Sequence, residues 1–136
     1  MPDTAPPVPG ADRPDRATAP LRTLKKRADF LKASRARRQA APGLLLQARR
    51  RQPDEGGQGI RLGFTCSRKV GNAVARNRAK RRLRAAARAV LAGAGRPGWD
   101  YVLVGRAGVT ASRPWPDLLA DLTRALSAIH ADRRKP

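Results

Sequence analysis

The chain has 136 residues, enough for one domain of modest size, and its single cysteine cannot form an intramolecular disulfide. Thirty lysines and arginines against ten acids give a formal net charge of +20, which calls for a polyanionic partner. No apolar run reaches the length of a membrane span and the N-terminus lacks the features of a secretory signal, which favours a cytoplasmic protein.

The two ends of the chain differ in composition from the rest. Six of the twelve prolines stand in residues 1–20, with few bulky apolar residues, and this composition predicts a disordered N-terminal extension. Residues 131–136 form a short basic tail. We therefore expect one folded domain over residues 21–130.

The sequence pattern of the first half of that domain predicts one helix and two strands. Apolar residues at helical spacing predict a helix over residues 24–38. A short apolar run predicts a strand over residues 44–48, and residues 60–67 alternate between apolar and polar in the pattern of a second strand. We expect these two strands to pair as a hairpin.

The sequence pattern of the second half of the domain predicts a helix, a strand and a second helix. A long basic helix is expected to begin after Asn72, a candidate N-cap, and to end at the glycine-containing segment 93–98. Residues 101–104 are continuously apolar, as in a strand buried on both faces. The last helix is predicted over residues 117–130. The expected fold class is α+β, a sandwich of helices on a small sheet.

The basic helix carries the strongest functional signal. Seven cations fall within residues 76–88, and no acid occurs over residues 56–99. A solvated face usually mixes signs, and a membrane-binding face needs bulky apolar residues, so nucleic acid is the favoured partner. The stripe expected to dock on the core is Ala79, Leu83, Ala86, Ala87 and Val90, and the arginines expected to project from the remainder are Arg78, Arg81, Arg82, Arg84 and Arg88.

Groups that could catalyse a reaction are few. His130 stands alone near the end of the last helix, where a histidine is expected to interact with terminal carbonyls, and Cys66 is expected in the core. Asp117 and Asp121 are expected to lie in the first turn of the last helix, where the helix dipole favours acidic side chains. Without Cys and His at metal-ligand spacing, the sequence predicts neither a catalytic residue nor a metal site in the protein.

Aromatic side chains and the basic turn offer further candidates. Residues 67–72 connect a strand to a helix N-terminus, which favours either a phosphate seat or an ordinary turn. Phe30 and Phe64 could stack on unpaired bases or pack in the core, whereas Trp99 and Trp115 are expected to pack.

Residues 67–84, SRKVGNAVARNRAKRRLR, resemble the signature of the bacterial ribonuclease P protein component. Two weaker markers stand in the same order, LKKRADF at residues 24–30 and DYVLVGR at residues 100–106. The resemblance implies an αβββαβα sandwich of the ribosomal protein S5 domain 2-like type, with a left-handed β-α-β crossover. It therefore implies a third strand before the basic helix, beyond the two that the pattern predicts.

The resemblance also implies a function. Such a protein is the non-catalytic cofactor of ribonuclease P, an endoribonuclease that removes the 5′ leader of precursor tRNA and leaves 5′-phosphomonoesters. The RNA subunit holds the active site and most of the Mg²⁺, so the implied partners are the catalytic RNA and precursor tRNA, with no membrane and no obligate protein partner. A structural RNA-binding protein of ribosomal type is the alternative.

The resemblance assigns two sets of residues. Ser34 and Gln47 stand where aromatic residues are common in the family, so leader binding is expected to depend more on charge and on salt. The residues expected to contact the catalytic RNA are Arg68, Lys69, Arg76, Asn77, Arg78, Lys80, Arg81 and Arg84. The residues expected in a leader-binding cleft between the first helix and the sheet are Arg27, Phe30, Ser34, Phe64, Lys80 and Arg84.

Overall fold

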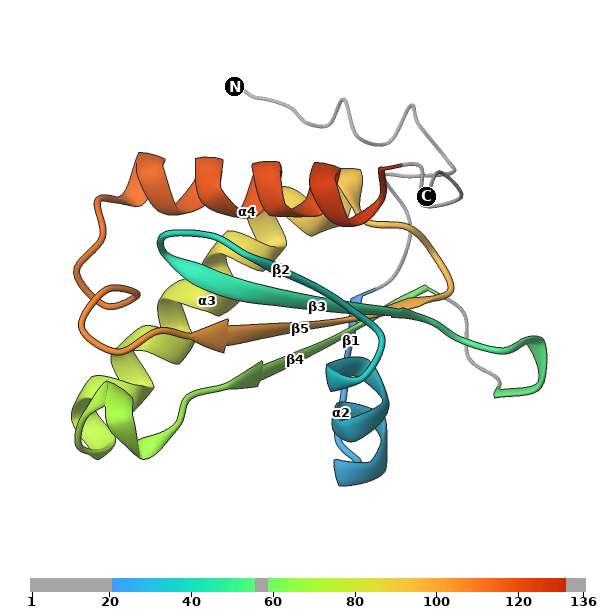
Figure 1. Cartoon of the computed structure of the whole chain (residues 1–136), viewed down its shortest axis with the longest axis horizontal. Coiled ribbons are helices and arrows are strands. Elements are labelled where there is room, and N and C mark those ends of the chain that lie inside the picture. Colours follow the sequence, from blue (N-terminus) through green and yellow to red (C-terminus); the bar gives the residue numbers. More distant parts are fainter. Residues whose placement is uncertain (1–20, 56–58, 132–136) are drawn as a thin grey trace, which may run out of the picture.

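A computed structural model describes residues 21–55 and 59–131. These residues fold into a five-stranded sheet with helices on both faces (Figure 1). The extension predicted over residues 1–20 lies outside the described residues, as does the basic tail from residue 132 onward. The elements in chain order are β1 (Leu21–Thr23), α2 (Arg27–Ser34), β2 (Arg37–Ala40), β3 (Leu44–Arg50), η2 (Pro53–Glu55), β4 (Ile60–Thr65), η3 (Arg68–Val70), α3 (Ala73–Ala94), β5 (Trp99–Gly105) and α4 (Trp115–Ile129).

The strands follow the order β1-β4-β5-β3-β2. β4 is parallel to β1 and to β5, whereas β3 is antiparallel to β5 and to β2. The predicted hairpin of β3 and β4 is wrong, because β5 lies between them and Val102 pairs with Gln47 on one side and Gly63 on the other. The continuous apolar run of β5 suits the centre of the sheet, where both of its faces are covered.

The first predicted helix is shorter than its apolar spacing indicated. α2 ends at Ser34, and residues 37–40 form the edge strand β2. This strand is the third one that the family resemblance implied, so from α2 onward the element order is αβββαβα, with β1 in addition. α3 crosses between the parallel strands β4 and β5, and the left-handedness expected for this crossover stays a prediction.

The larger core lies between the sheet and the pair α3 and α4. α3 docks through the predicted alanine-rich stripe, in which Ala79, Leu83 and Ala87 are fully buried, with Leu91 extending it. The strands contribute alternate residues, because every second side chain of a strand points to the same face. These core residues are Leu44, Leu46, Ala48, Ile60, Leu62, Trp99, Tyr101 and Leu103.

A smaller core on the opposite face holds α2, which projects from that side of the sheet in Figure 1. Leu24, Ala33 and Val102 form it, and the half-buried ring of Phe30 packs against them. Gly63 makes this approach possible, since a Cβ atom at that position would lie 2.5 Å from the Phe30 ring. The glycine is thus required for the seat of α2 on β4.

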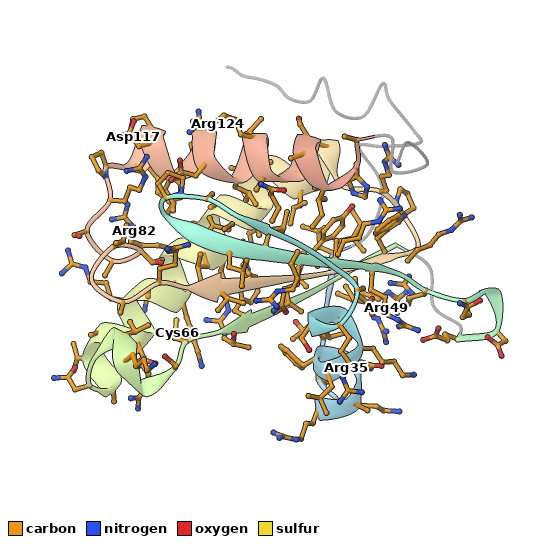
Figure 2. All side chains as sticks on the ribbon, in the orientation of Figure 1. Arg35, Arg49, Cys66, Arg82, Asp117 and Arg124 are labelled. Carbon is orange, nitrogen blue, oxygen red and sulfur yellow. The ribbon has the colours of Figure 1, made fainter. Side chains whose placement is uncertain are left out.

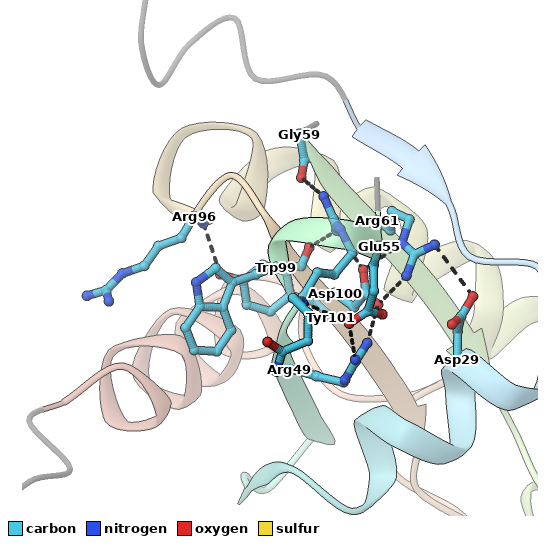
Figure 3. A network of polar contacts seen from close by, with 11 residues as sticks. Asp29, Arg49, Glu55, Gly59, Arg61, Arg96, Trp99, Asp100 and Tyr101 are labelled. Carbon is cyan, nitrogen blue, oxygen red and sulfur yellow. Dashed lines mark hydrogen bonds and ion pairs between the residues drawn. The ribbon is translucent and has the colours of Figure 1, made fainter. Parts of the chain in front are cut away.

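A buried ion cluster fixes the same region (Figure 3). The carboxylate of Asp100 on β5 is fully buried and accepts a hydrogen bond from Arg51 at 2.7 Å and two from Arg61, both at 2.7 Å. Arg61 also pairs with Asp29 of α2 at 3.5 Å, and Arg49 of β3 lies 3.8 Å from the Asp100 carboxylate, so the cluster joins β3, β4, β5 and α2. At its edge, the hydrogen bond from Arg49 lowers the pKa of Glu55 to about 2.

Asp121 departs from its predicted role. Whereas Asp117 is an exposed first-turn acid as expected, Asp121 lies in the second turn of α4 and is fully buried. Arg113 donates two hydrogen bonds to its carboxylate, and Arg124 donates one at 3.0 Å. Burial of this charge is possible because two guanidinium groups neutralise it.

Tyr101 provides a test of the larger core, because it is the single tyrosine of the chain. Its ring is fully buried, its hydroxyl accepts a hydrogen bond from the Arg96 amide at 2.9 Å, and the Nε2 atom of His130 lies 2.7 Å from the same oxygen. Burial raises the pKa of Tyr101 to about 12.

We therefore expect tyrosinate absorbance to appear with a midpoint near pH 12 in the folded protein. The buried neutral phenol contributes stability that is complete below the ordinary pKa of about 10 and is lost as the pH rises from there to about 12. A spectrophotometric titration, with Tyr101→Phe as the blank, measures this midpoint. Ionisation at the ordinary pKa while the fold persists would contradict the burial of the ring.

Candidate nucleic-acid interface

The basic helix α3 begins at a well-defined turn. Asn72 is its N-cap, as predicted, and its side-chain oxygen accepts a hydrogen bond from the Ala75 amide at 2.9 Å. Gly71 has a φ of 141°, a conformation that favours glycine, and the guanidinium of Arg76 donates to its carbonyl at 2.9 Å. The turn therefore holds the start of α3, and with it the direction of the basic face, in one geometry.

The exposed face of α3 carries cations without acidic partners. Arg78, Arg81, Arg84 and Arg88 are exposed as predicted, and Asn77 is exposed beside them. Within the described residues, every ion pair joins an acid to an arginine outside α3, as in the Asp100 and Asp121 clusters. The acids thus neutralise arginines of the strands, the loops and α4, and the charge of α3 remains available to an external anion.

Arg82 departs from the sequence prediction, which placed it with the projecting arginines. Its guanidinium is half-buried and donates to the carbonyls of Ala111 and Arg113, in the segment before α4 (Figure 2). It also lies 5.8 Å from the centroid of the Trp115 ring. Arg82 therefore links α3 to the start of α4, and its guanidinium already donates hydrogen bonds within the protein.

The remaining predicted RNA-contact residues surround the end of β4. Lys69 is exposed, and the side chain of Arg68 lies outside the described part of the chain. Lys80 and Arg76 are half-buried beside Cys66. Burial raises the pKa of the Cys66 thiol, and the charges of Lys80 and Arg76 oppose this effect without cancelling it.

A shallow depression marks the first three turns of α3. It is lined by Val74, Asn77, Arg78 and Arg81. Val74 is 75% exposed, an unusual position for a large apolar side chain that is surrounded by cations. An apolar side chain flanked by two guanidinium groups can contact a sugar of a nucleic acid while the arginines donate to its phosphates.

Three of the predicted leader-cleft residues lie on the face of the sheet that α2 covers. Arg27 is exposed, Phe30 is half-buried, and the Ser34 hydroxyl donates to the Leu31 carbonyl at 2.7 Å. Gln47, which stands where the family resemblance expects an aromatic residue, is only 8% exposed. This face therefore offers one aromatic ring, and that ring is partly used in packing.

The other members of the predicted cleft lie on the opposite face. Phe64 packs against the larger core, and the Arg84 guanidinium lies 5.5 Å from the centroid of its ring. Phe30 and Phe64 are thus separated by β4, since Phe30 contacts Gly63 from one side and the Phe64 side chain points to the other. The structure does not bring all six predicted residues into one cleft.

Neither a cluster of metal ligands nor a membrane-spanning helix occurs among the described residues. Over residues 21–55 and 59–131, the histidine, cysteine and acidic side chains form no group of three that could hold a metal ion. Among the same residues, no helix combines the length and the apolar character needed to cross a membrane.

Comparisons with known proteins agree with the fold and with the signature on α3. The family model described as Ribonuclease P matches residues 19–130. The chain is 63% identical to the ribonuclease P protein component of Ruegeria pomeroyi, over 86% of this chain and 93% of the relative. It is 45% identical to the corresponding component of Caulobacter vibrioides, over 85% of this chain and 75% of the relative.

Solved structures agree on the fold. The ribonuclease P protein of Thermotoga maritima superposes with a TM-score of 0.65 at 25% identity, over 79% of this chain and 96% of that chain. That of Staphylococcus aureus superposes with a TM-score of 0.62 at 23% identity, over 78% of this chain and 93% of that chain, a likeness in fold alone.

Proposed function

Because the chain belongs to the ribonuclease P protein family, we propose that it binds the catalytic RNA and the 5′ leader of precursor tRNA and so supports Mg²⁺-dependent leader removal. The observation that carries this proposal is the exposed face of α3, where Asn77, Arg78 and Arg81 have no acidic partner among the described residues. Arginine forks of this kind donate paired hydrogen bonds to phosphates.

We assign the first turns of α3 to the catalytic RNA. Asn77, Arg78 and Arg81 line one depression, and the Asn72 cap and the Arg76 bond to Gly71 fix the backbone from which they project. Because the helix backbone is already ordered, binding a structured RNA costs the entropy of these side chains and not that of the chain. We assign Lys69 to the catalytic RNA as well, and Lys80 and Arg84, toward the end of β4, to both the catalytic RNA and the leader.

The protein's share of the reaction is to bind and to position. Asp100 and Asp121, its fully buried acids, are each held by arginines, so neither is available as a base or as a metal ligand. We propose that Mg²⁺ is bound mainly by the RNA subunit, where it supplies the nucleophile, and that the holoenzyme acts in the cytoplasm. Added positive charge from α3 would lower the Mg²⁺ concentration at which the two RNAs associate.

Cleavage of a precursor tRNA at low Mg²⁺ tests this function. The purified protein, its cognate catalytic RNA and the mixture of both are compared for release of mature 5′ ends. We expect the mixture alone to cleave at low Mg²⁺ and the RNA alone to need more. If the protein gives no stimulation at any Mg²⁺ concentration, the cofactor role is wrong and a structural, ribosomal-type role takes its place.

A further inference from the structure

A groove that the sequence did not predict lies on the α3 face of the sheet, between the edge strand β1 and α3. It encloses about 120 Å³, too little for a drug-sized ligand but suited to one planar ring with the rest of its molecule in solvent. Its lining comes from β1, β4 and α3, with no acid among the lining residues. These residues are Leu21, Arg22, Thr23, Leu62, Phe64, Arg84 and Arg88.

The groove combines an aromatic ring with two free cations. Phe64 is half-buried and fixed by the larger core, and Arg84 lies over it at 5.5 Å. Arg84 and Arg88 are both exposed, one turn apart on α3, and neither forms an ion pair within the described residues. Unpaired bases stack on guanidinium planes as well as on aromatic rings, so an Arg84 backed by Phe64 forms a stacking platform.

The rim opposite α3 adds apolar and polar contacts. Leu21 packs against the larger core, and the register of β1 with β4 places Thr23 on the same face as Leu62. Thr23 is exposed and lines the groove, so its hydroxyl can form a hydrogen bond with a base edge. A nucleotide in the groove would thus stack toward α3 and form hydrogen bonds toward β1.

The face that holds α2 likewise offers a single aromatic ring for stacking. Ser34 and Gln47 occupy the positions at which aromatic residues were expected, and Phe30 is packed on Gly63. Contact with unpaired bases on that face rests on one partly buried ring. The groove beside β1 supplies a second ring, Phe64, together with the phosphate-binding charge of Arg84 and Arg88.

We propose that this groove binds one unpaired nucleotide of the 5′ leader, with its base on the Arg84–Phe64 platform and its phosphate at Arg88. The inference rests on the proposed function and deepens it, since it extends leader binding from the α2 face to the opposite side of β4. Single-stranded leader is the occupant because a base fixed in a duplex cannot enter a groove of this size, whereas an unpaired base can turn out of its strand.

The test compares two substrates of the reconstituted holoenzyme, one with a leader of about ten nucleotides and one with a single-nucleotide leader. Loss of one stacked base is expected to lower kcat/KM for the long leader about tenfold in Phe64→Leu, with a smaller loss in Arg88→Ala. The single-nucleotide leader should show little change. Phe64→Tyr, which keeps a stacking ring, should retain the long-leader preference, and Arg50→Ala, an exposed arginine outside the groove, is the charge-matched control for Arg88→Ala.

The possible outcomes separate this inference from the cofactor role. A loss confined to the long leader, with thermal unfolding and affinity for the catalytic RNA unchanged, supports the groove. Equal loss on both substrates, or none on either, overturns it while leaving the cofactor role in place. A wild-type protein that does not stimulate the catalytic RNA at all would instead remove the proposed function, and the groove assignment with it.

Discussion

Replacing Asp100 with asparagine is expected to lower the free energy of unfolding by about 3–5 kcal/mol, the usual cost of leaving a buried charge without its partner. The substitution keeps the size of the side chain and removes its charge. Arg51, whose side chain is 2% exposed, and Arg61 would then share a buried site with a neutral amide. Since small domains are stable by about 5–15 kcal/mol, the variant would lie close to its unfolding threshold.

Urea denaturation followed by tryptophan fluorescence measures this loss. The matched control is Asp54→Asn, which removes the same charge from an exposed side chain and should change stability by less than about 0.5 kcal/mol. If both substitutions shift the midpoint equally, the Asp100 cluster does not stabilise the fold as its geometry indicates. Because the cluster reaches α2 through Asp29, Asp100→Asn should also loosen the seat of Phe30 on β4.

The second large effect concerns RNA. Replacing Arg78 and Arg81 with alanine together is expected to weaken assembly with the catalytic RNA about tenfold to hundredfold, because each solvent-screened phosphate contact of an exposed arginine contributes about 1 kcal/mol. The slope of log affinity against log salt should fall in magnitude by about one for each lost phosphate contact. Both side chains are exposed and line the depression on the first turns of α3, so the fold should not change.

A titration of labelled catalytic RNA at several salt concentrations gives both quantities. The control is the pair Arg50→Ala and Arg96→Ala, which removes the same charge at the other end of the sheet, where Arg50 pairs with Trp99. If net charge alone governed assembly, the two double variants would lose affinity alike. An unchanged affinity and slope in the α3 variant would exclude this helix face from the RNA interface.

The family resemblance predicted more of the fold than the periodicity of apolar residues did. Periodicity located α3, β5 and α4 and missed β2, because two of the four residues of this edge strand are arginines and its alternation is weak. The resemblance supplied that strand. Neither predicted β1, since three residues, LRT, are too short to show a period. The groove beside β1 could therefore not be predicted, although its members Phe64 and Arg84 were already candidate site residues.

Arg78, Arg81 and Arg84 are exposed on α3, as the sequence predicted. Helix register is a local property, so an N-cap at Asn72 and an alanine stripe suffice to show that Arg78 and Arg81 project outward. Arg82 differs only because a distant segment, Ala111 to Arg113, offers it carbonyl acceptors. The sequence around residue 82 contains no feature that predicts this contact.

The sequence by itself determined the class of partner, the position of the basic helix and the family, because charge, period and a contiguous signature are all readable within short segments. Only the tertiary structure decided which arginines the protein neutralises internally, and that Phe30 and Phe64 lie on opposite faces of β4. The insertion of β5 between β3 and β4 brings Asp100 to Arg51 and Arg61, and the packing of α2 on Gly63 puts Phe30 on the face opposite Phe64. Both contacts join segments far apart in the chain, which no short segment of the sequence reports.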